Sequence, residues 1–294
     1  MRLSIGAAFL AFALCAAAQT KSRPAPLASV ESVQLSASVE RGKQVVPLAP
    51  GMELKEGDRV NTGARSRLEL RLAEGSTVRL GEKGSLFFDK AQMRDDGVFE
   101  AALFVAEGAF RFTTGALGKL AGKRELTIAV NNVTAGIRGT DLWGKSTQES
   151  DIVCLIEGSI EVTPPGERPF TLDQRFSFYA LEGNVSRPVA TVPLDKFREW
   201  AAETEQEPGQ GVANRSGKWK IFVAGFKKSG DALAAYNAMR RAGYPAEFFP
   251  DKSGEARVYT VRLSGFASEK DAKSAVEALK AQPEVAKFPY KVGM

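Results

Sequence analysis

Between residues 30 and 190, short stretches in which every second side chain is apolar follow one another, separated by glycines. In residues 67–72, for example, Leu68, Leu70 and Leu72 alternate with charged side chains. This spacing of two places the three leucines on one face of a strand, whereas an amphipathic helix repeats about every 3.6 residues. The spacing therefore predicts an all-β domain over residues 30–192, with tight turns between its strands.

Glycines mark the expected turns of this domain, at Gly57, Gly75, Gly108 and Gly158. Tight turns need positive φ angles, which glycine adopts at the lowest cost. We therefore expect these four residues to be structural. Residues 136–140 gather Gly, Arg and Thr; we expect a tight, hydrogen-bonded connection there, with a binding site as the alternative.

The first 18 residues have the plan of a secretory signal, with Arg2, an apolar run over residues 3–14 and small residues up to Ala18. We expect cleavage near Ala18, followed by a leader over residues 19–29. A membrane anchor is one alternative, but the run is shorter than the roughly 20 residues that a bilayer core needs. We therefore expect no transmembrane span in the mature chain. Lipidation at Cys15 is a second alternative, which the bulky Leu14 disfavours.

Histidine is absent from the sequence, and cleavage would leave Cys154 as the one cysteine. Ser-His-Asp and Cys-His catalysis are thereby excluded, together with the commonest transition-metal ligand. We expect no catalytic residue, no metal site and no cofactor, and a buried Cys154 in its apolar stretch. A carboxylate pair is the remaining catalytic route. Its best candidates, Asp95 and Asp96, precede Gly97 in an expected hairpin turn.

Residues 193–215 separate the β domain from a second region. Phe197, Trp200 and Ala201 recur at three- and four-residue spacing, which predicts a helix over residues 194–207. Residues 203–214 are polar and broken by Pro208. We expect them to form the linker between two domains.

Residues 216–294 combine strand and helix patterns. Strands are predicted at residues 219–224, 246–249, 257–263 and 285–292, and helices at residues 230–242 and 268–281. The order β-α-β-β-α-β predicts an α+β domain, with a four-stranded antiparallel sheet and two helices on one of its faces. The other face would stay open for binding.

This second region carries 14 basic and 8 acidic side chains. A positive surplus suits a nucleic acid or another anionic surface. A four-stranded sheet of this order is also the plan of an RNA-binding domain. Because of the secretory signal and the missing aromatic-rich RNA-binding strand, we expect an anionic cell wall rather than a nucleic acid.

The two halves of this region repeat a strand, a Gly-Phe pair and a helix, with the pairs at residues 225–226 and 265–266. In this pattern, and in its position after a signal peptide, the region resembles the SPOR (sporulation-related repeat) domain. The resemblance implies binding of peptidoglycan glycan strands stripped of their stem peptides, often at sites of cell division.

Alternation assigns the strand faces, because successive side chains of a strand point to opposite sides. Trp219, Ile221 and Val223 would pack on the helices. Aromatic platforms and hydrogen-bond donors suit sugar recognition. The expected glycan-binding residues are Phe222, Ala224, Phe248, Phe249, Thr260, Arg262 and Ser264, with one of the two adjacent phenylalanines facing the glycan.

Two of these residues bear on the resemblance. Arg262 matches the usual basic position of the family, whereas Phe222 stands where the family commonly has Gln. The departure at Phe222 would weaken or retune glycan binding. The alternative is that Phe222 is buried by the linker or by the first domain.

The first domain resembles the FecR periplasmic domain over residues 30–165. The similarity lies in residues 54–63, 68–72, 74–81, 85–88, 107–112, 133–143 and 156–162. FecR-like regulators that relay a receptor signal to a sigma factor carry a transmembrane segment and a cytoplasmic piece, which we do not find in this sequence. The resemblance therefore implies the β scaffold and not the sigma relay.

Together, these observations predict an exported, non-enzymatic periplasmic protein. Its SPOR-like domain would bind denuded glycan strands, and its FecR-like domain would act as an interaction or scaffold module for an envelope protein. The alternative is a periplasmic signalling or protein-interaction module without glycan binding. A septal location is an option that the resemblance leaves open.

Overall fold

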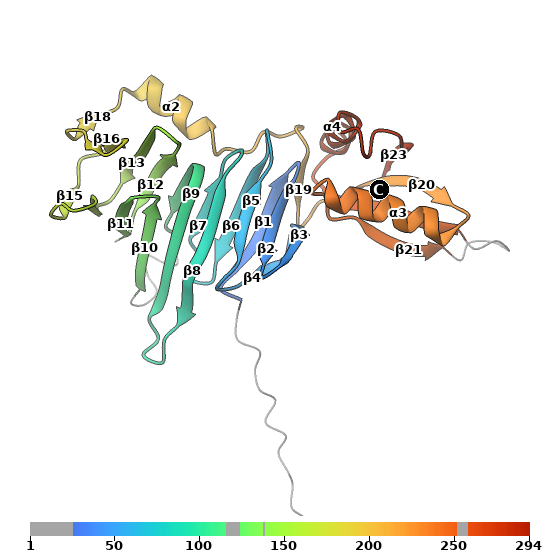
Figure 1. The fold of residues 1–294 in the computed structure, drawn as a ribbon, viewed down its shortest axis with the longest axis horizontal. Coiled ribbons are helices and arrows are strands. Elements are labelled where there is room, and N and C mark those ends of the chain that lie inside the picture. The colour runs from blue at the N-terminus through green and yellow to red at the C-terminus, as the bar shows by residue number, and fades with distance from the viewer. Residues whose placement is uncertain (1–25, 116–123, 138, 252–257) are drawn as a thin grey trace, which may run out of the picture.

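The computed structural model describes residues 26–115, 124–137, 139–251 and 258–294, which form two domains joined by a short segment (Figure 1). The predicted signal peptide, most of the leader and Arg138 lie outside these residues. The N-terminal domain is all-β and the C-terminal domain combines strands and helices, so the predicted fold classes are confirmed.

The N-terminal domain consists of two sheets. The first sheet contains β1 (Ala28–Gln34), β6 (Arg67–Leu72), β7 (Thr77–Leu80), β12 (Asp141–Ser146), β13 (Ser150–Glu157) and β16 (Ser177–Glu182), with the short strands β4 (Glu53–Leu54), β17 (Val185–Ser186) and β18 (Ala190–Thr191) beside them. The second sheet contains β2 (Ala37–Arg41), β3 (Gln44–Pro47), β5 (Arg59–Thr62), β8 (Ser85–Met93), β10 (Arg124–Val130), β11 (Val133–Ile137), β14 (Ile160–Thr163) and β15 (Phe170–Leu172). Leu68, Leu70 and Leu72 lie in the core between the two sheets, as alternation predicts.

Strand β9 (Phe99–Thr113) belongs to both sheets and bends at Gly108. Its first part pairs with β8, and its last part pairs with β7 and β12. Gly108 has a φ of +88°, and a Cβ there would stand 2.6 Å from the Cα of Gly84. Glycine is therefore required at this bend. The predicted positive φ is also present at Gly57, Gly75 and Gly158.

Helix α2 (Leu194–Ala202) packs on the outer face of the first sheet. Trp200 of this helix stacks on Trp143 of β12, with ring centroids 4.8 Å apart. Cys154 lies in the same apolar cluster and is fully buried, as predicted, and burial raises the pKa of its thiol to about 12. The helix ends at Ala202. The prediction of a helix through residue 207 is therefore wrong in its last part.

Residues 203–214, which we call the connecting segment, instead bond to the first sheet. Glu203 pairs with Lys145 of β12 at 2.7 Å, and Glu205 pairs with Arg111 of β9 at 2.9 Å. The segment ends in β19 (Val212–Asn214), which pairs with β1. After the helix ends, the side chains of the segment thus pair with the sheet, and its backbone continues into a strand.

The C-terminal domain contains β20 (Trp219–Phe226), α3 (Ser229–Arg241), β21 (Glu247–Asp251), β22 (Val258–Phe266), α4 (Glu269–Lys280) and β23 (Tyr290–Gly293). This is the predicted β-α-β-β-α-β order. The strands form an antiparallel sheet in the order β21–β22–β20–β23. Its helix-facing side chains are buried in one core, which includes Ile221, Val223, Val261 and Leu263. The predicted helix-facing side of β20 is therefore confirmed.

Candidate functional site

The sheet face that α3 and α4 leave uncovered, which we call the open face, carries a row of four side chains across all four strands. Arg262 stands directly opposite Glu247 on one side and Phe222 on the other, and Phe222 stands opposite Lys291. Residues directly opposite one another in an antiparallel sheet share a face, with Cβ atoms about 5 Å apart. The row therefore runs from β21 through β22 and β20 to β23.

Arg262 is held at the centre of this face by two neighbours. Its Nε donates to Oε2 of Glu247 at 2.8 Å, and its guanidinium lies 4.1 Å from the ring centroid of Phe249. Ser264 Oγ donates to the same Glu247 oxygen at 3.0 Å. One third of the Arg262 side chain stays exposed. Because its orientation is fixed while part of its side chain stays exposed, Arg262 is available to a ligand.

The structure separates the two adjacent phenylalanines of β21. Phe249 is 39% exposed and pairs with Thr260, which places both on the open face. Phe248 stacks on Tyr259, at 5.6 Å between centroids, and packs against Tyr236 of α3. Phe248 therefore belongs to the helix-side core. Its assignment to the glycan site is corrected, since alternation from Glu247 turns it inward.

The other predicted site residues fall as follows. Phe222 is half-buried and packs over Gly293 of β23, where a Cβ would stand 3.4 Å from its ring. The side chain of Ala224 lies outside the described part of the chain. The structure thus gathers Phe222, Phe249, Thr260, Arg262 and Ser264 on one face. Sequence reasoning missed Glu247 and Lys291, whose places in the row depend on strand register.

Two carboxylates of the first domain, Asp58 and the catalytic candidate Asp96, are engaged in structural contacts. Asp58 is fully buried and accepts two hydrogen bonds from Arg41, at 2.7 and 2.6 Å. Asp96 pairs with Arg94 in an exposed hairpin turn that has Gly97 at a φ of +75°. The turn predicted at residues 95–97 is therefore confirmed.

Residues 136–140 form a connection rather than a pocket, as far as they are described. Thr140 Oγ1 donates to the carbonyl of Ser159 at 2.8 Å, and the Thr140 N–H donates to Thr114 Oγ1 at 3.0 Å. These bonds fix the chain between β11 and β12. The expected hydrogen-bonded connection is therefore confirmed for Thr140.

The two domains are joined through Asp271, in the first turn of α4. Its Oδ1 accepts hydrogen bonds from the backbone N–H groups of Gly209, Gly211 and Val212, at 2.8, 3.2 and 2.9 Å. Its Oδ2 accepts from the hydroxyl of Ser268, the N-cap of α4, at 2.5 Å. β19 also pairs with β22. The open face is therefore held in a defined orientation to the first domain.

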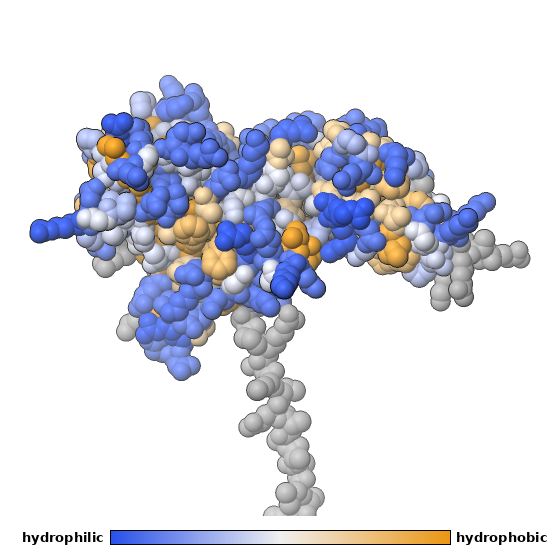
Figure 2. All heavy atoms as spheres, in the orientation of Figure 1, coloured by the Kyte–Doolittle hydropathy of each residue, from blue (hydrophilic) through white to orange (hydrophobic). Residues whose placement is uncertain are grey.

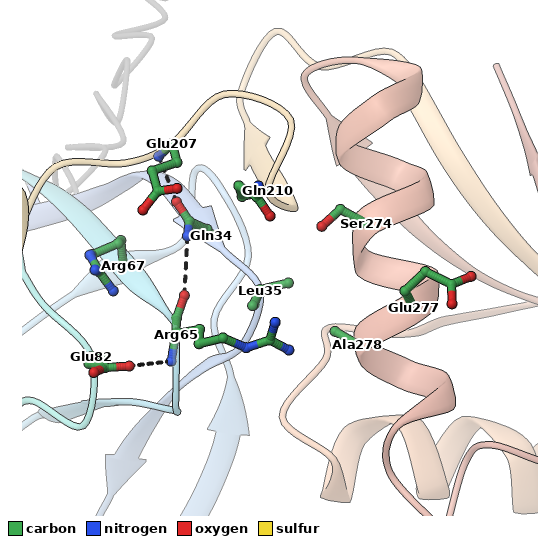
Figure 3. Close-up of a pocket in the computed structure, with 10 residues that line it drawn as sticks. All are labelled: Gln34, Leu35, Arg65, Arg67, Glu82, Glu207, Gln210, Ser274, Glu277 and Ala278. Atoms are coloured by element: carbon green, nitrogen blue, oxygen red, sulfur yellow. Dashed lines mark hydrogen bonds between the residues drawn. The ribbon is translucent and has the colours of Figure 1, made fainter.

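A polar groove of about 460 Å³ lies between the domains, beside α4 (Figure 3). Figure 3 shows Arg65 extending from the first domain toward α4, with Arg67 nearby. Residues of both domains line the groove: Gln34, Leu35, Arg65, Arg67, Glu82, Glu207, Gln210, Ser274, Glu277 and Ala278. Elsewhere, the face in Figure 2 is mainly hydrophilic, and its apolar side chains form separate spots.

Comparisons with known families agree with this arrangement. Residues 58–161 match the family model described as FecR protein, and residues 215–287 match the model described as SPOR domain. The chain is a FecR-like domain followed by a SPOR domain. The SPOR match covers three of the four strands that build the open face, and β23 follows it directly.

No curated protein matches the chain. Similar solved structures include two crystal structures of a proposed anti-sigma factor from Parabacteroides distasonis, each 11% identical, with a TM-score of 0.40, covering 76% of this chain and 90% of that chain. A similarity of this size carries no argument about function.

Both domain types are non-catalytic binding or signalling modules, and a SPOR domain implies peptidoglycan binding. Within the described residues, no helix combines the length and the apolar character that crossing a membrane requires. Because a SPOR domain implies peptidoglycan binding, the open face of this domain is the candidate binding site.

Proposed function

We propose that the SPOR domain binds peptidoglycan glycan strands on its open face, while the FecR-like domain serves as an interaction or scaffold module for an envelope protein. The observation that carries this proposal is that Arg262, Phe222 and Lys291 lie side by side in the row on the open face, with Phe249 under the guanidinium. Aromatic rings suit the apolar faces of sugars, and the cationic groups suit their oxygens.

The dimensions of the row support a saccharide ligand. Neighbouring strands lie about 4.8 Å apart, so the span from Arg262 to Lys291 is about 10 Å. This length is similar to that of one disaccharide unit. A glycan strand lying across β22, β20 and β23 would therefore place successive sugar groups over Phe222 and beside both cations.

The charge of the row favours glycan without stem peptides. When an amidase removes a stem peptide, the lactyl group left on the muramic acid ends in a carboxylate. A guanidinium forms its strongest hydrogen bonds with such a carboxylate. This carboxylate lies on the sugar itself, so a denuded strand across the row would present it to Arg262 and Lys291, whereas a strand with its stem peptide has a neutral amide in its place.

We further propose that the protein is exported to the periplasm, with signal cleavage near Ala18, and that denuded glycan concentrates it at the septum. The apolar run at residues 3–14 motivates the first part. A fluorescent fusion that carries the native leader tests both parts. A cytoplasmic signal would contradict export, and an even peripheral signal in dividing cells would contradict septal enrichment.

Co-sedimentation with purified sacculi, before and after amidase treatment, tests the binding proposal on the mature chain. We expect pelleting to rise after treatment and to fall in the Arg262→Ala and Phe222→Ala variants. Lys273→Ala is the matched control, because this exposed cation lies on α4 and not on the open face. Equal pelleting of Arg262→Ala and wild type would overturn the site. Absence of pelleting in every case would favour a protein-interaction module without glycan binding.

A further inference from the structure

The groove between the domains is a preformed cavity on the helix side of the SPOR domain. One wall is α4, whose Asp271 binds three N–H groups of the connecting segment. The facing wall is fixed by Gln34, which is 3% exposed. Its amide oxygen accepts from the Glu207 N–H at 2.8 Å, and its amide nitrogen donates to the Arg65 carbonyl at 3.1 Å. Both walls are therefore held in place without a ligand.

Arg65 has a strained backbone at the mouth of this groove. Its φ is +55°, a value that side chains other than Gly, Asn and Asp rarely adopt. Its N–H donates to Oε2 of Glu82 at 2.7 Å, and Gln34 binds its carbonyl. Two side chains thus hold Arg65 in a costly conformation, and such strain gathers at functional positions. The result is a guanidinium that extends into the groove toward α4 (Figure 3).

Arg67 supplies a second cation with unused donors. Its Nε is buried without a hydrogen-bond partner, and its Nη1 donates only to the carbonyl of Ser66, at 3.1 Å. A buried donor without a partner is costly and calls for an explanation. Both Arg65 and Arg67 are among the ten residues that line the groove. Within the described part of the chain, neither of them forms an ion pair. Two planar guanidiniums with free donors match carboxylates best.

We propose that the groove binds a short peptide through its free carboxylates, with Arg65 and Arg67 as the carboxylate-binding residues. The volume of about 460 Å³ lies within the range of small-ligand sites, about 300–1,000 Å³. Figure 3 shows the Glu207 carboxylate on the same side of the groove, where it suits an ammonium group of the ligand. Ser274 of α4 adds a neutral hydroxyl on the opposite wall.

The occupant we propose is the free stem peptide of the cell wall, which carries several carboxylates and, on its diamino acid, an amine. This choice rests on the proposed function, because an amidase releases the stem peptide where it exposes denuded glycan. The carboxylate chemistry of the groove does not depend on that function. One chain would then bind both products of the same cleavage, at separate sites.

Isothermal titration of the mature chain with the tetrapeptide L-Ala-γ-D-Glu-meso-diaminopimelate-D-Ala tests this proposal. The same peptide with its carboxylates amidated is the ligand control. We expect saturable binding of the free peptide only, weakened about tenfold or more by Arg65→Asn or by Arg67→Ala. Asn tolerates the left-handed backbone at position 65, so this variant should stay folded. Arg71→Ala, an exposed arginine of β6, should bind like wild type.

Two further results separate this proposal from the proposed function. Arg262→Ala should lose pelleting with denuded sacculi and keep the affinity for the tetrapeptide. Absent peptide binding, equal binding of the amidated peptide, or unchanged affinity in Arg65→Asn would overturn the groove proposal while glycan pelleting stands. Peptide binding without any pelleting would instead overturn the glycan proposal alone.

Discussion

Replacing Asp271 with alanine removes the carboxylate that joins the SPOR domain to the connecting segment. Three backbone N–H groups donate to its Oδ1, at 2.8, 3.2 and 2.9 Å. Asp271 is 1% exposed, so water reaches these donors only after local rearrangement. Each buried donor without a partner costs about 1–3 kcal/mol. Allowing for partial hydration, we expect Asp271→Ala to lower the free energy of unfolding by about 3–5 kcal/mol.

Asp271→Asn separates the loss of the negative charge from the loss of the accepting oxygen. An asparagine keeps an oxygen for the three donors but loses the negative charge, and charge-assisted hydrogen bonds are about twice as strong as neutral ones. We expect a loss of about 1–2 kcal/mol for this variant. Asp231→Ala is the control, because Asp231 is an exposed acid in the first turn of α3. Its loss should cost less than about 1 kcal/mol.

Urea unfolding of the mature chain measures these differences, and hydrogen exchange over residues 204–215 locates them. Amides of the connecting segment should lose protection in Asp271→Ala, retain part of it in Asp271→Asn and stay protected in Asp231→Ala. The reasoning is refuted if Asp271→Ala unfolds within about 0.5 kcal/mol of wild type with unchanged exchange.

Three other predictions concern buried groups and close packing. The pKa of Cys154 rises from 9.0 to about 12 through burial, so the folded chain holds a proton that the unfolded chain loses. The difference in free energy of unfolding between wild type and Cys154→Ala should therefore be constant below pH 9, and the wild type should lose stability relative to the variant between pH 9 and 12. Urea unfolding at several pH values measures this difference, and a difference that stays constant up to pH 12 would contradict the prediction. Gly217→Ala would place a Cβ 2.0 Å from the Gly265 carbonyl oxygen; we expect a loss of about 2–3 kcal/mol in thermal unfolding, and an unchanged Tm would exclude the clash. Trp200→Ala removes the ring stacked 4.8 Å from Trp143; a loss of about 2–3 kcal/mol and a weaker near-ultraviolet circular dichroism are expected, whereas an unchanged spectrum would argue against the stack.

Alternation and glycine placement were sufficient to predict which faces are buried. The spacing predicts buried side chains at four strand positions, and all four are 0% exposed: Leu68, Leu70, Ile221 and Val223. Period-two patterns carry this information because each strand face either packs or meets solvent. The same patterns do not say which residue stands opposite which across two strands. The sequence therefore did not indicate which of Phe248 and Phe249 lies on the open face.

The missed residues of the open face follow from the same limit. Glu247 matters because register places it opposite Arg262, where it accepts a hydrogen bond at 2.8 Å. Lys291 enters the row only through the pairing of β23 with β20. Neither pairing follows from local composition. A basic residue at position 291 and an acidic one at position 247 are common surface choices in a single sequence.

The connecting segment shows a second limit. Its polar composition and Pro208 predict a linker, and the chain does connect two domains there. Its hydrogen bonds, however, go to groups far away in the sequence, such as Asp271 and Gln34. Backbone groups must find partners when they are buried. A polar stretch reveals that need but not the partner, which only the fold of both domains supplies.

Chemical-shift mapping with a denuded glycan oligosaccharide tests the central claim most directly. The mature chain, labelled with ¹⁵N, is titrated with a peptide-free tetrasaccharide. The backbone amides of Phe222, Arg262 and Lys291, together with the Arg262 Nε–H, should shift in a saturable manner, while Ser274 on α4 stays unchanged. Saturable shifts confined to the helix side, or no shifts at millimolar ligand, would contradict glycan binding by the open face.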